Sequence, residues 1–404
     1  MKSDRSETQI VALVAAVQFV NILDFMMVMP MGPFFAAALG IPSSDLGVIG
    51  GAYTAAAGLS GLLGSLFLDR FDRRSALAVS MLGLVLGTAA GGLATGLPSL
   101  LAARVLAGCF GGPATSLSLS IISDVVPPER RGRAMGLVMM SFSLSSVLGV
   151  PTGLWLAERG GWRLPFFAVA GIGAVLAASA VFLLPRMRAH LDGPAHAQPS
   201  YLSLVRRPEV FLAYALTAVT MTSVFIVVPN IAAYVVFNLG YSQSDYKFLY
   251  LVGGLFTVVV LRLVGVLVDR VGAVPVATFG TALYLVVLYV AFVGPIAGLP
   301  IMVVFVAFMV TSSFRNVPFQ TLSSRVPQPA ERARFTSLQS SVQHLSAAAA
   351  GVASSQLLSE RADKSLIGMD HVAVIAMIAS LAVPVLMWLI DRRLPKPVAA
   401  PAKA

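Results

Sequence analysis

The sequence predicts an all-α membrane protein with twelve transmembrane helices in two parallel six-helix repeats. Three observations support this fold class. The composition is 57% hydrophobic and only 11% charged, whereas a soluble domain carries about 25% charged residues. The chain divides into twelve apolar segments, and a bilayer takes about 20 residues per helix. The pair Asp69-Arg70 recurs 200 positions later as Asp269-Arg270.

Each apolar segment is expected to be a helix, because an open strand in lipid leaves backbone groups unpaired. The first begins after Lys2 and Arg5, as a signal peptide would. It is too long for a cleaved signal, so it is interpreted as a span. The segments are 10–35, 46–68, 75–95, 99–123, 134–157, 165–185, 210–236, 246–268, 275–294, 300–323, 335–358 and 371–390.

The positions of Lys and Arg predict the orientation of the chain. With both termini in the cytoplasm, the inner loops and termini hold 20 basic residues and the outer loops hold 5. Cytoplasmic loops carry such an excess in membrane proteins. The asymmetry predicts a multi-pass inner-membrane protein with both termini cytoplasmic. It also explains the net charge of +10 without a nucleic-acid partner.

The two halves of the chain repeat each other. Besides the Asp-Arg pair, Glu331-Arg332 follows Glu129-Arg130 by 202 positions. Six spans per half preserve orientation, so the repeats are parallel. The stretch between Arg186 and Glu209 is rich in Pro, His and Arg and is predicted to be a linker. The predicted domains are a six-helix bundle at 1–189, a cytoplasmic linker at 190–208 and a second bundle at 209–404.

The first span carries one acid, Asp24. A charge at the bilayer centre costs at least about 3 kcal/mol, which is tolerated when the group faces a cavity or a partner. Gln18, Asn21 and Asp24 recur every third residue and share one face of the helix. This pattern predicts a functional acid, and the alternative is a buried acid that hydrogen bonds satisfy.

Arg104 in the fourth span is predicted to lie close enough to Asp24 to interact with it. At about 1.5 Å per residue, Asp24 and Arg104 lie roughly 21 and 22 Å from the inner face. The cation favours the carboxylate and desolvation favours the neutral acid, so such a site can load and release a proton. A static ion pair that fixes helix packing is the alternative.

A second group of polar residues lies in the later spans. Arg262 and Arg315 are placed about 9–12 Å from the inner face, where they can bind an anionic substrate group or a backbone carbonyl. Arg262 can instead extend toward the headgroups. His344 is near mid-membrane and can carry protons, bind substrate or simply pack. The other candidate substrate contacts are Asn230, Asn316, Gln339 and Gln343, together with Gln18 and Asn21.

The loop after the second span resembles the signature of the major facilitator superfamily. That signature runs Gly-x-Leu-Ala-Asp-Arg-x-Gly-Arg-Arg, and Asp69, Arg70, Arg73 and Arg74 fit it. Two of its glycines are replaced, by Ser65 and Asp72. In the second half the copy of this motif keeps both glycines but lacks the later arginines.

Two further elements carry the resemblance. Arg104, Gly108 and Gly111 resemble the family's Arg-x-x-x-Gly element, and Gly149-Val-Pro-Thr-Gly153 resembles, imperfectly, the proline–glycine element of its antiporter branch. The resemblance covers nearly the whole chain. It implies two bundles around a central cavity, with the third, sixth, ninth and twelfth spans outermost. Those four segments contain no Asp, Glu, Lys or Arg.

The resemblance also implies a network of charged residues that holds the two halves together on the cytoplasmic side. By position its members are Asp69, Arg73 and Asp124. A solvated charge cluster that only sets topology is the alternative. The full set of residues assigned to this cytoplasmic gate is Asp69, Arg70, Arg73, Asp124, Arg133 and Asp269.

The sequence therefore predicts a proton-coupled secondary transporter that works by alternating access. Export of a small amphipathic or sugar-like compound is expected, as in the twelve-helix drug–proton antiporters and sugar-efflux permeases that the chain resembles. Asp24, Arg104 and His344 are the proton-coupling candidates. The alternatives are a proton-coupled importer or uniporter of a metabolite, and a receptor that does not transport. No enzyme, cofactor or metal motif is found, Cys109 is a packing residue, and a monomer in the lipid bilayer is expected.

Overall fold

The computed structural model describes residues 2–188, 204–296, 298–328 and 331–394. Within these ranges the side chains of 2–6, 65–67, 69, 128, 129, 131–133, 139 and 333 are not described. The predicted linker at 190–208 lies mostly outside the described residues.

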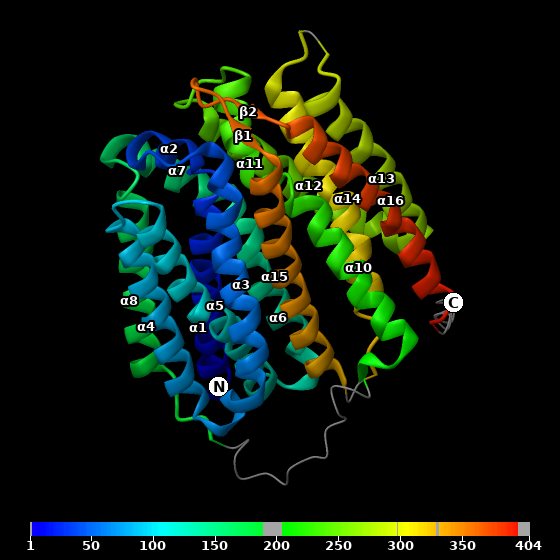
Figure 1. Ribbon diagram of the computed structural model, residues 1–404. Helices are drawn as coiled ribbons and strands as arrows, with labels where there is room; N and C mark the ends of the chain where they lie inside the picture. Colours follow the sequence, from blue (N-terminus) through cyan, green and yellow to red (C-terminus); the bar gives the residue numbers. More distant parts are fainter. Residues whose placement is uncertain (1, 189–203, 297, 329–330, 395–404) are drawn as a thin grey trace.

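The first half consists of helices that run back and forth along one axis (Figure 1). Two of its six spans are divided into shorter helical pieces. Its elements are α1 (Lys2–Val28), α2 (Gly32–Leu39), the 3₁₀ turn η1 (Ser43–Asp45), α3 (Leu46–Phe67), the 3₁₀ turn η2 (Leu68–Arg70), α4 (Arg73–Gly92), α5 (Leu97–Val125), α6 (Pro128–Leu144), the π-helical turn η3 (Ser145–Gly149), α7 (Val150–Gly160) and α8 (Leu164–Leu183).

The second half repeats this arrangement and adds a two-stranded hairpin that the sequence analysis did not predict. In the hairpin, Ser359 pairs with Ile367 and Glu360 with Leu366, antiparallel. The elements are α10 (Pro208–Phe225), α11 (Val228–Ala233), the π-helical turns η4 (Tyr234–Asn238) and η5 (Tyr289–Val293), α12 (Tyr246–Val271), α13 (Ala273–Leu288), α14 (Ile301–Ser323), α15 (Arg332–Leu357), β1 (Ser359–Glu360), β2 (Leu366–Ile367) and α16 (Met369–Asp391).

All twelve predicted segments are helical, but the first and seventh are broken by proline. The first was predicted to run unbroken over 10–35, whereas α1 ends at Val28 and α2 begins at Gly32. Pro30 lies in the intervening turn and Pro33 in the first turn of α2. Pro229 likewise lies in the first turn of α11. Proline has no N–H and disfavours helix in the residue before it, so these breaks are local in origin.

Eleven helices of the described residues are long and apolar enough to cross a membrane. The remaining predicted segment, 335–358, corresponds to α15, which has 26 residues. Its polarity comes from serines and from Gln339, Gln343 and His344. A helix that packs mainly against other helices can be polar where a lipid-facing one cannot, and α15 packs along α3.

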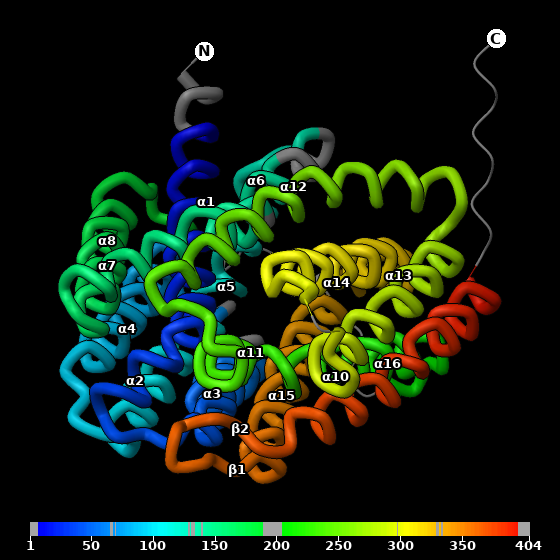
Figure 2. The backbone as a smooth tube through the Cα atoms, turned by 90° about the horizontal axis from the view of Figure 1, so that it is seen from above, coloured from blue at the N-terminus to red at the C-terminus, as the bar shows by residue number. Residues whose placement is uncertain are grey.

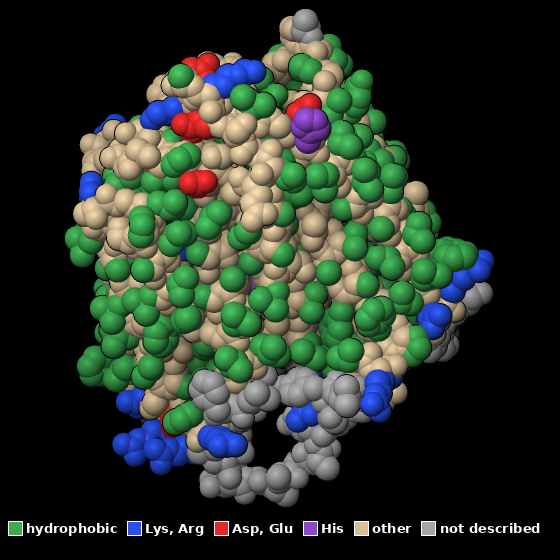
Figure 3. Space-filling model, in the orientation of Figure 1, with side chains coloured by type: hydrophobic (Ala, Val, Ile, Leu, Met, Phe, Trp, Pro, Cys, Tyr) green, Lys and Arg blue, Asp and Glu red, His purple; other side chains and the backbone are tan. Residues whose placement is uncertain are grey.

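The surface matches a protein embedded in a bilayer. In Figure 3, hydrophobic side chains cover the middle of the visible face, and Lys and Arg side chains gather along its lower edge. We call that edge the basic end, and the opposite edge, which carries β1 and β2, the hairpin end. The N-terminus lies at the basic end (Figure 1).

The two halves meet most closely toward the hairpin end. Figure 2 places α3 of the first half beside α15 of the second. A Cβ atom on Gly47 would lie 2.1 Å from the carbonyl oxygen of Gly351, so the helix backbones touch there. Lys364 Nζ also donates to the carbonyl oxygen of Ala36, and Lys247 pairs with Glu158.

Candidate functional site

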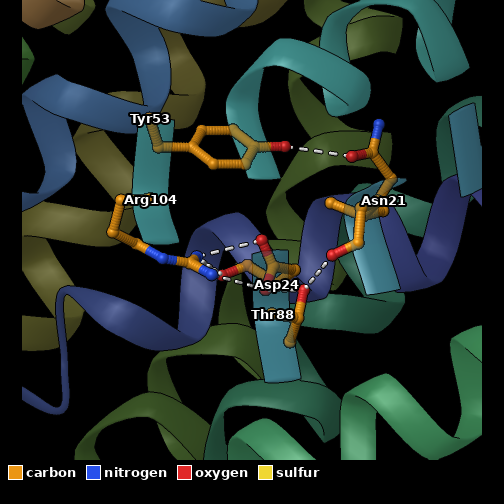
Figure 4. A network of polar contacts seen from close by, with 6 residues as sticks. Asn21, Asp24, Tyr53, Thr88 and Arg104 are labelled. Carbon is orange, nitrogen blue, oxygen red and sulfur yellow. Dashed lines mark hydrogen bonds and ion pairs between the residues drawn. The ribbon is translucent and has the colours of Figure 1, made fainter. Parts of the chain in front are cut away.

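The structure brings Asp24 and Arg104 together inside the first half (Figure 4). Arg104 Nη1 donates to Asp24 Oδ2 at 3.0 Å, and Nη2 donates to Oδ1 at 3.2 Å. The two residues are 0% and 1% exposed, so the pair is sealed from solvent. Two parallel bonds between a guanidinium and a carboxylate form the strongest common ion-pair geometry.

A third helix completes the environment of the carboxylate. Thr88 Oγ1 on α4 donates to Asp24 Oδ1 at 2.7 Å. The guanidinium carbon of Arg104 lies 5.4 Å from the ring centre of Phe166 and 5.8 Å from that of Tyr53. Aromatic faces attract cations, and more strongly where water is excluded. The acid is therefore held by a cation and a hydroxyl, and the cation by two rings.

The polar face of α1 is turned toward α5. Asn21 Nδ2 donates to the carbonyl oxygen of Gly111 at 3.0 Å and to Thr115 Oγ1 at 2.8 Å. Its Oδ1 accepts a bond from Tyr53 Oη at 3.0 Å. One turn earlier, Gln18 Nε2 donates to Thr115 Oγ1 at 3.4 Å. Gln18 and Asn21, predicted as cavity residues, are each only 4% exposed.

Glycines on α5 allow this close approach. A Cβ atom on Gly111 would lie 2.3 Å from Tyr53 Oη and 2.8 Å from Asn21 Oδ1. A Cβ atom on Gly108 would lie 2.3 Å from the carbonyl oxygen of Tyr53. Arg104 precedes Gly108 by about one turn, so the motif Arg-x-x-x-Gly supplies both the cation and the space beside it.

The buried cation of the second half, Arg315, has a different environment. Its Nη2 donates to Ser223 Oγ at 2.7 Å, and its guanidinium carbon lies 4.2 Å from the ring centre of Tyr284. Arg315 is 1% exposed, whereas its neighbour Asn316 is exposed. Arg315 was predicted to contact substrate, and in this conformation it lies inside the second bundle.

The remaining candidates are spread over the second half. Asn230 Nδ2 donates to Ser354 Oγ at 3.0 Å, and Gln339 Nε2 donates to Thr217 Oγ1 at 3.3 Å. Gln343 is half-buried and Arg262 is exposed. His344 lies at the junction of the halves, because a Cβ atom on Gly58 would lie 3.1 Å from His344 Cβ.

At the basic end, Arg73 joins α4 to α5. Its Nε lies 3.3 Å from Asp124 Oδ2, which brings together two of the three predicted gate residues. Arg70 and Asp269 are exposed. The side chains of Asp69 and Arg133, also predicted in the gate, are outside the described residues.

Asp72 caps the N-terminus of α4, a role that was not predicted from the sequence. Its Oδ1 accepts from the backbone N–H of Ser75 at 3.2 Å and so caps α4. Its Oδ2 accepts from the backbone N–H of Met187 at 3.1 Å. The signal was present, because an Asp three residues before a helical N–H is a favoured cap. In the sequence, Asp72 was interpreted only as the residue that replaces a glycine of the family signature.

Comparison with known proteins now identifies the family. The sequence profile of the Major Facilitator Superfamily matches residues 14–351, and again 213–404. The chain belongs to the major facilitator superfamily. The family consists of multi-pass membrane transporters rather than enzymes.

Two curated proteins are similar to about half of this chain. It is 30% identical over 201 residues to the inner membrane transport protein YdhP of Escherichia coli K12, across 48% of this chain and 50% of that protein. It is 27% identical to a chloramphenicol resistance protein of Streptomyces lividans, across 48% and 50% of the two chains. The matched region thus spans about half the length of these relatives.

A solved structure confirms the predicted fold class. A bacterial homologue of the human lysosomal transporter Spinster, in an inward-facing and unoccupied conformation, superposes with a TM-score of 0.76. The superposition covers 98% of this transporter and 99% of that chain, at 16% identity. The similarity concerns the fold alone.

The hydroxyl of Thr88 offers a first test of the site. Replacing Thr88 by Val keeps the shape and removes the bond to Asp24, so the free energy of unfolding should fall by about 1–3 kcal/mol. Thr311→Val is the matched control, because within the described part of the chain Thr311 Oγ1 bonds to carbonyl oxygens of its own helix. Thermal unfolding of both purified variants measures the difference. Equal midpoints for Thr88→Val and the unmodified transporter would contradict the assigned bond.

Proposed function

We propose that this transporter exports a small amphipathic or sugar-like compound in exchange for protons, by alternating access. The observation that carries the proposal is the sealed pair of Asp24 and Arg104. Among the described residues, Asp24 and Asp72 are the buried carboxylates, and Asp72 lies at the basic end. A buried ionisable group within membrane helices is retained mainly for function.

The pair suits a proton switch because its two charges depend on each other. While Asp24 is ionised, it neutralises Arg104, and the site as a whole carries no net charge. Protonation leaves the guanidinium without a counter-charge in a dry environment, an unfavourable state. The bundle then gains free energy by moving so that water reaches Arg104. Because the pair is sealed here, the proposal requires that proton exchange occur in another conformation.

The contacts between the halves support alternating access. The contacts of Gly47 with Gly351 and of Lys364 with Ala36 lie toward the hairpin end. We propose that the basic end faces the cytoplasm, with both termini there, and that this conformation is open toward it. The halves at 1–189 and 209–404 would then rock about the central spans, as in other transporters built from repeats.

Substrate contact is proposed for four polar residues of the second half. His344 and Gln343 lie on α15, which packs against α3, and Arg262 and Asn316 are exposed on α12 and α14. His344 remains a candidate for proton transfer because an imidazole ring can both accept and donate a proton. Export is favoured over import by the chloramphenicol resistance protein among the relatives. We propose a monomer as the working unit.

Proteoliposomes with an imposed pH gradient test this function. The vesicles hold a pH-sensitive dye, and a panel of compounds that includes chloramphenicol and simple sugars is added outside. A transported compound should move opposite to protons and collapse the gradient. One proton crossing 100 mV contributes about 2.3 kcal/mol, enough for roughly 50-fold accumulation.

Three other outcomes would contradict parts of the proposal. Movement of compound and protons in the same direction identifies a symporter and removes the export assignment. Flux without proton movement identifies a uniporter. Saturable binding without flux of any compound identifies a receptor.

A further inference from the structure

The second half contains a counterpart of the ion-pair site in which the carboxylate is missing. Arg104, Asp24 and Thr88 lie on α5, α1 and α4, the fourth, first and third spans of their half. Arg315, Ser223 and Tyr284 lie on α14, α10 and α13, which are the fourth, first and third spans of the second half. The two sets therefore occupy equivalent helices of the repeat.

Two of the three spacings along the chain match the repeat offset of about 200 positions, whereas Arg315 lies further along its helix than Arg104 does. Ser223 follows Asp24 by 199 positions, Tyr284 follows Thr88 by 196, and Arg315 follows Arg104 by 211. In both halves the arginine donates to the side chain from the first span. The chemistry differs in one respect, because a serine stands where the first half has an aspartate.

This difference leaves the charge of Arg315 without a counter-charge. Among the described residues, no Asp or Glu forms an ion pair with Arg315, which is 1% exposed. The Tyr284 hydroxyl does not supply one either, since it donates its own hydrogen to the carbonyl oxygen of Ser223 at 3.2 Å. An uncompensated charge buried in a membrane protein is strongly unfavourable.

Unused hydrogen-bond donors surround the same place. Arg315 Nε and Nη1 are buried and have no acceptor among the described residues. The hydroxyls of Thr220 and Thr281 are also buried without a partner. Thr220 and Thr281 precede Ser223 and Tyr284 by three residues, so each lies on the same helix face as its neighbour. Buried donors of this kind indicate a missing acceptor.

We propose that the cluster of Arg315, Ser223 and Tyr284 binds a small monovalent anion, which takes the place of the Asp24 carboxylate. The anion neutralises the guanidinium and accepts bonds from Nε and Nη1. The two halves then hold analogous neutral pairs, one with a carboxylate of the chain and one with an exchangeable ion. The ion is either a free inorganic anion or the carboxylate of a bound small molecule.

Thermal unfolding of the purified, full-length transporter in detergent tests the site. The buffer contains gluconate as the bulky, strongly hydrated reference anion, which is then replaced by chloride, nitrate or formate at constant ionic strength. Binding to the folded state raises the midpoint in a saturable way, here by about 2 °C or more at high anion concentration. An unchanged midpoint in all three anions, and in the larger carboxylate benzoate, overturns the proposal.

Two variants at one position separate charge from shape. Ser223→Asp supplies the missing carboxylate, so its midpoint should no longer respond to chloride and should exceed that of the unmodified protein in gluconate. Ser223→Asn is similar in shape but neutral, and should keep the response. Equal responses in both variants overturn the proposal. If Ser223→Asp does not fold, Arg315→Gln decides instead, since a chloride response retained without the guanidinium also overturns it.

The size of the effective anion identifies its source. Stabilisation by chloride and formate, with none by benzoate, indicates a free inorganic ion. Stabilisation by larger carboxylates alone indicates the acidic group of a small molecule. The experiments on the unmodified protein and on its variants measure anion binding and not transport. Their outcome therefore does not depend on whether the protein exports its substrate in exchange for protons.

Discussion

Asp24→Asn is expected to abolish transport driven by a pH gradient and to lower the free energy of unfolding by about 3–5 kcal/mol. Asparagine keeps the shape of the side chain but cannot ionise, so no proton can be exchanged. The stability falls because the buried guanidinium of Arg104 loses its counter-charge. Dye-loaded proteoliposomes measure the transport, and thermal unfolding in detergent measures the stability.

Two controls separate these effects. Asp370→Asn makes the same chemical change at a carboxylate that is 54% exposed, and should alter neither quantity. The double variant Asp24→Asn with Arg104→Gln removes both charges. It should recover much of the lost stability, since an apolar or neutral replacement of a whole buried pair is often tolerated. It should recover none of the transport. Proton-driven transport retained by Asp24→Asn would leave only a packing role for the pair.

Gly47→Ala is expected to reduce transport at least about tenfold, which corresponds to a shift of about 1.4 kcal/mol between conformations. The added Cβ would lie 2.1 Å from the carbonyl oxygen of Gly351 and 2.7 Å from Ser354 Oγ. The oxygen belongs to the backbone of α15, so the whole helix must move away from α3. The hairpin end then closes poorly, while the packing within each half stays intact.

Gly61→Ala on the same helix is the matched control. A Cβ atom there would meet only Gly112 Cα, at 4.0 Å, so transport should persist. Opening of the hairpin end is measured by labelling Ser355→Cys with a membrane-impermeant maleimide, after replacing Cys109 by Ser. Ser355 Oγ is buried beside Gly47 in the unmodified protein. Labelling no faster in Gly47→Ala than in Gly61→Ala would contradict the assigned role.

Much of the helical architecture was predictable because it follows from solvation. Twelve apolar segments must form helices in lipid, and for most of them the observed bounds agree with the predicted ones to within a few residues. The first segment was predicted to start eight residues too late and to run without a break, because the effect of Pro30 on the helix end was not considered. The hairpin was missed because strands of two residues leave almost no pattern in a sequence.

Site residues could be predicted from the sequence where their residue type is energetically costly to bury in a membrane. They could not be predicted where their residue type is common in membrane helices. Asp24 and Arg104 stood out because charges are rare within membrane helices. Thr88 and Tyr53, which contact this pair, did not stand out, and neither did Thr115, which bonds to Asn21. Hydroxyl groups recur throughout these helices, and most threonine and serine hydroxyls there bond to the backbone of their own helix. Ser223 and Tyr284 were missed for the same reason, although the repeat offset that relates the halves was visible in the loops.

By itself the sequence determined the class of protein, its two repeated halves and the presence of a titratable group in the membrane. Those properties depend on the transfer of each residue between water and lipid, which is a local quantity. The tertiary structure alone decided that the predicted pair of Asp24 and Arg104 is sealed from solvent, and that no carboxylate of the described residues faces Arg315. Which helix face meets which neighbour depends on contacts between residues 80 or more positions apart, and no local pattern records them.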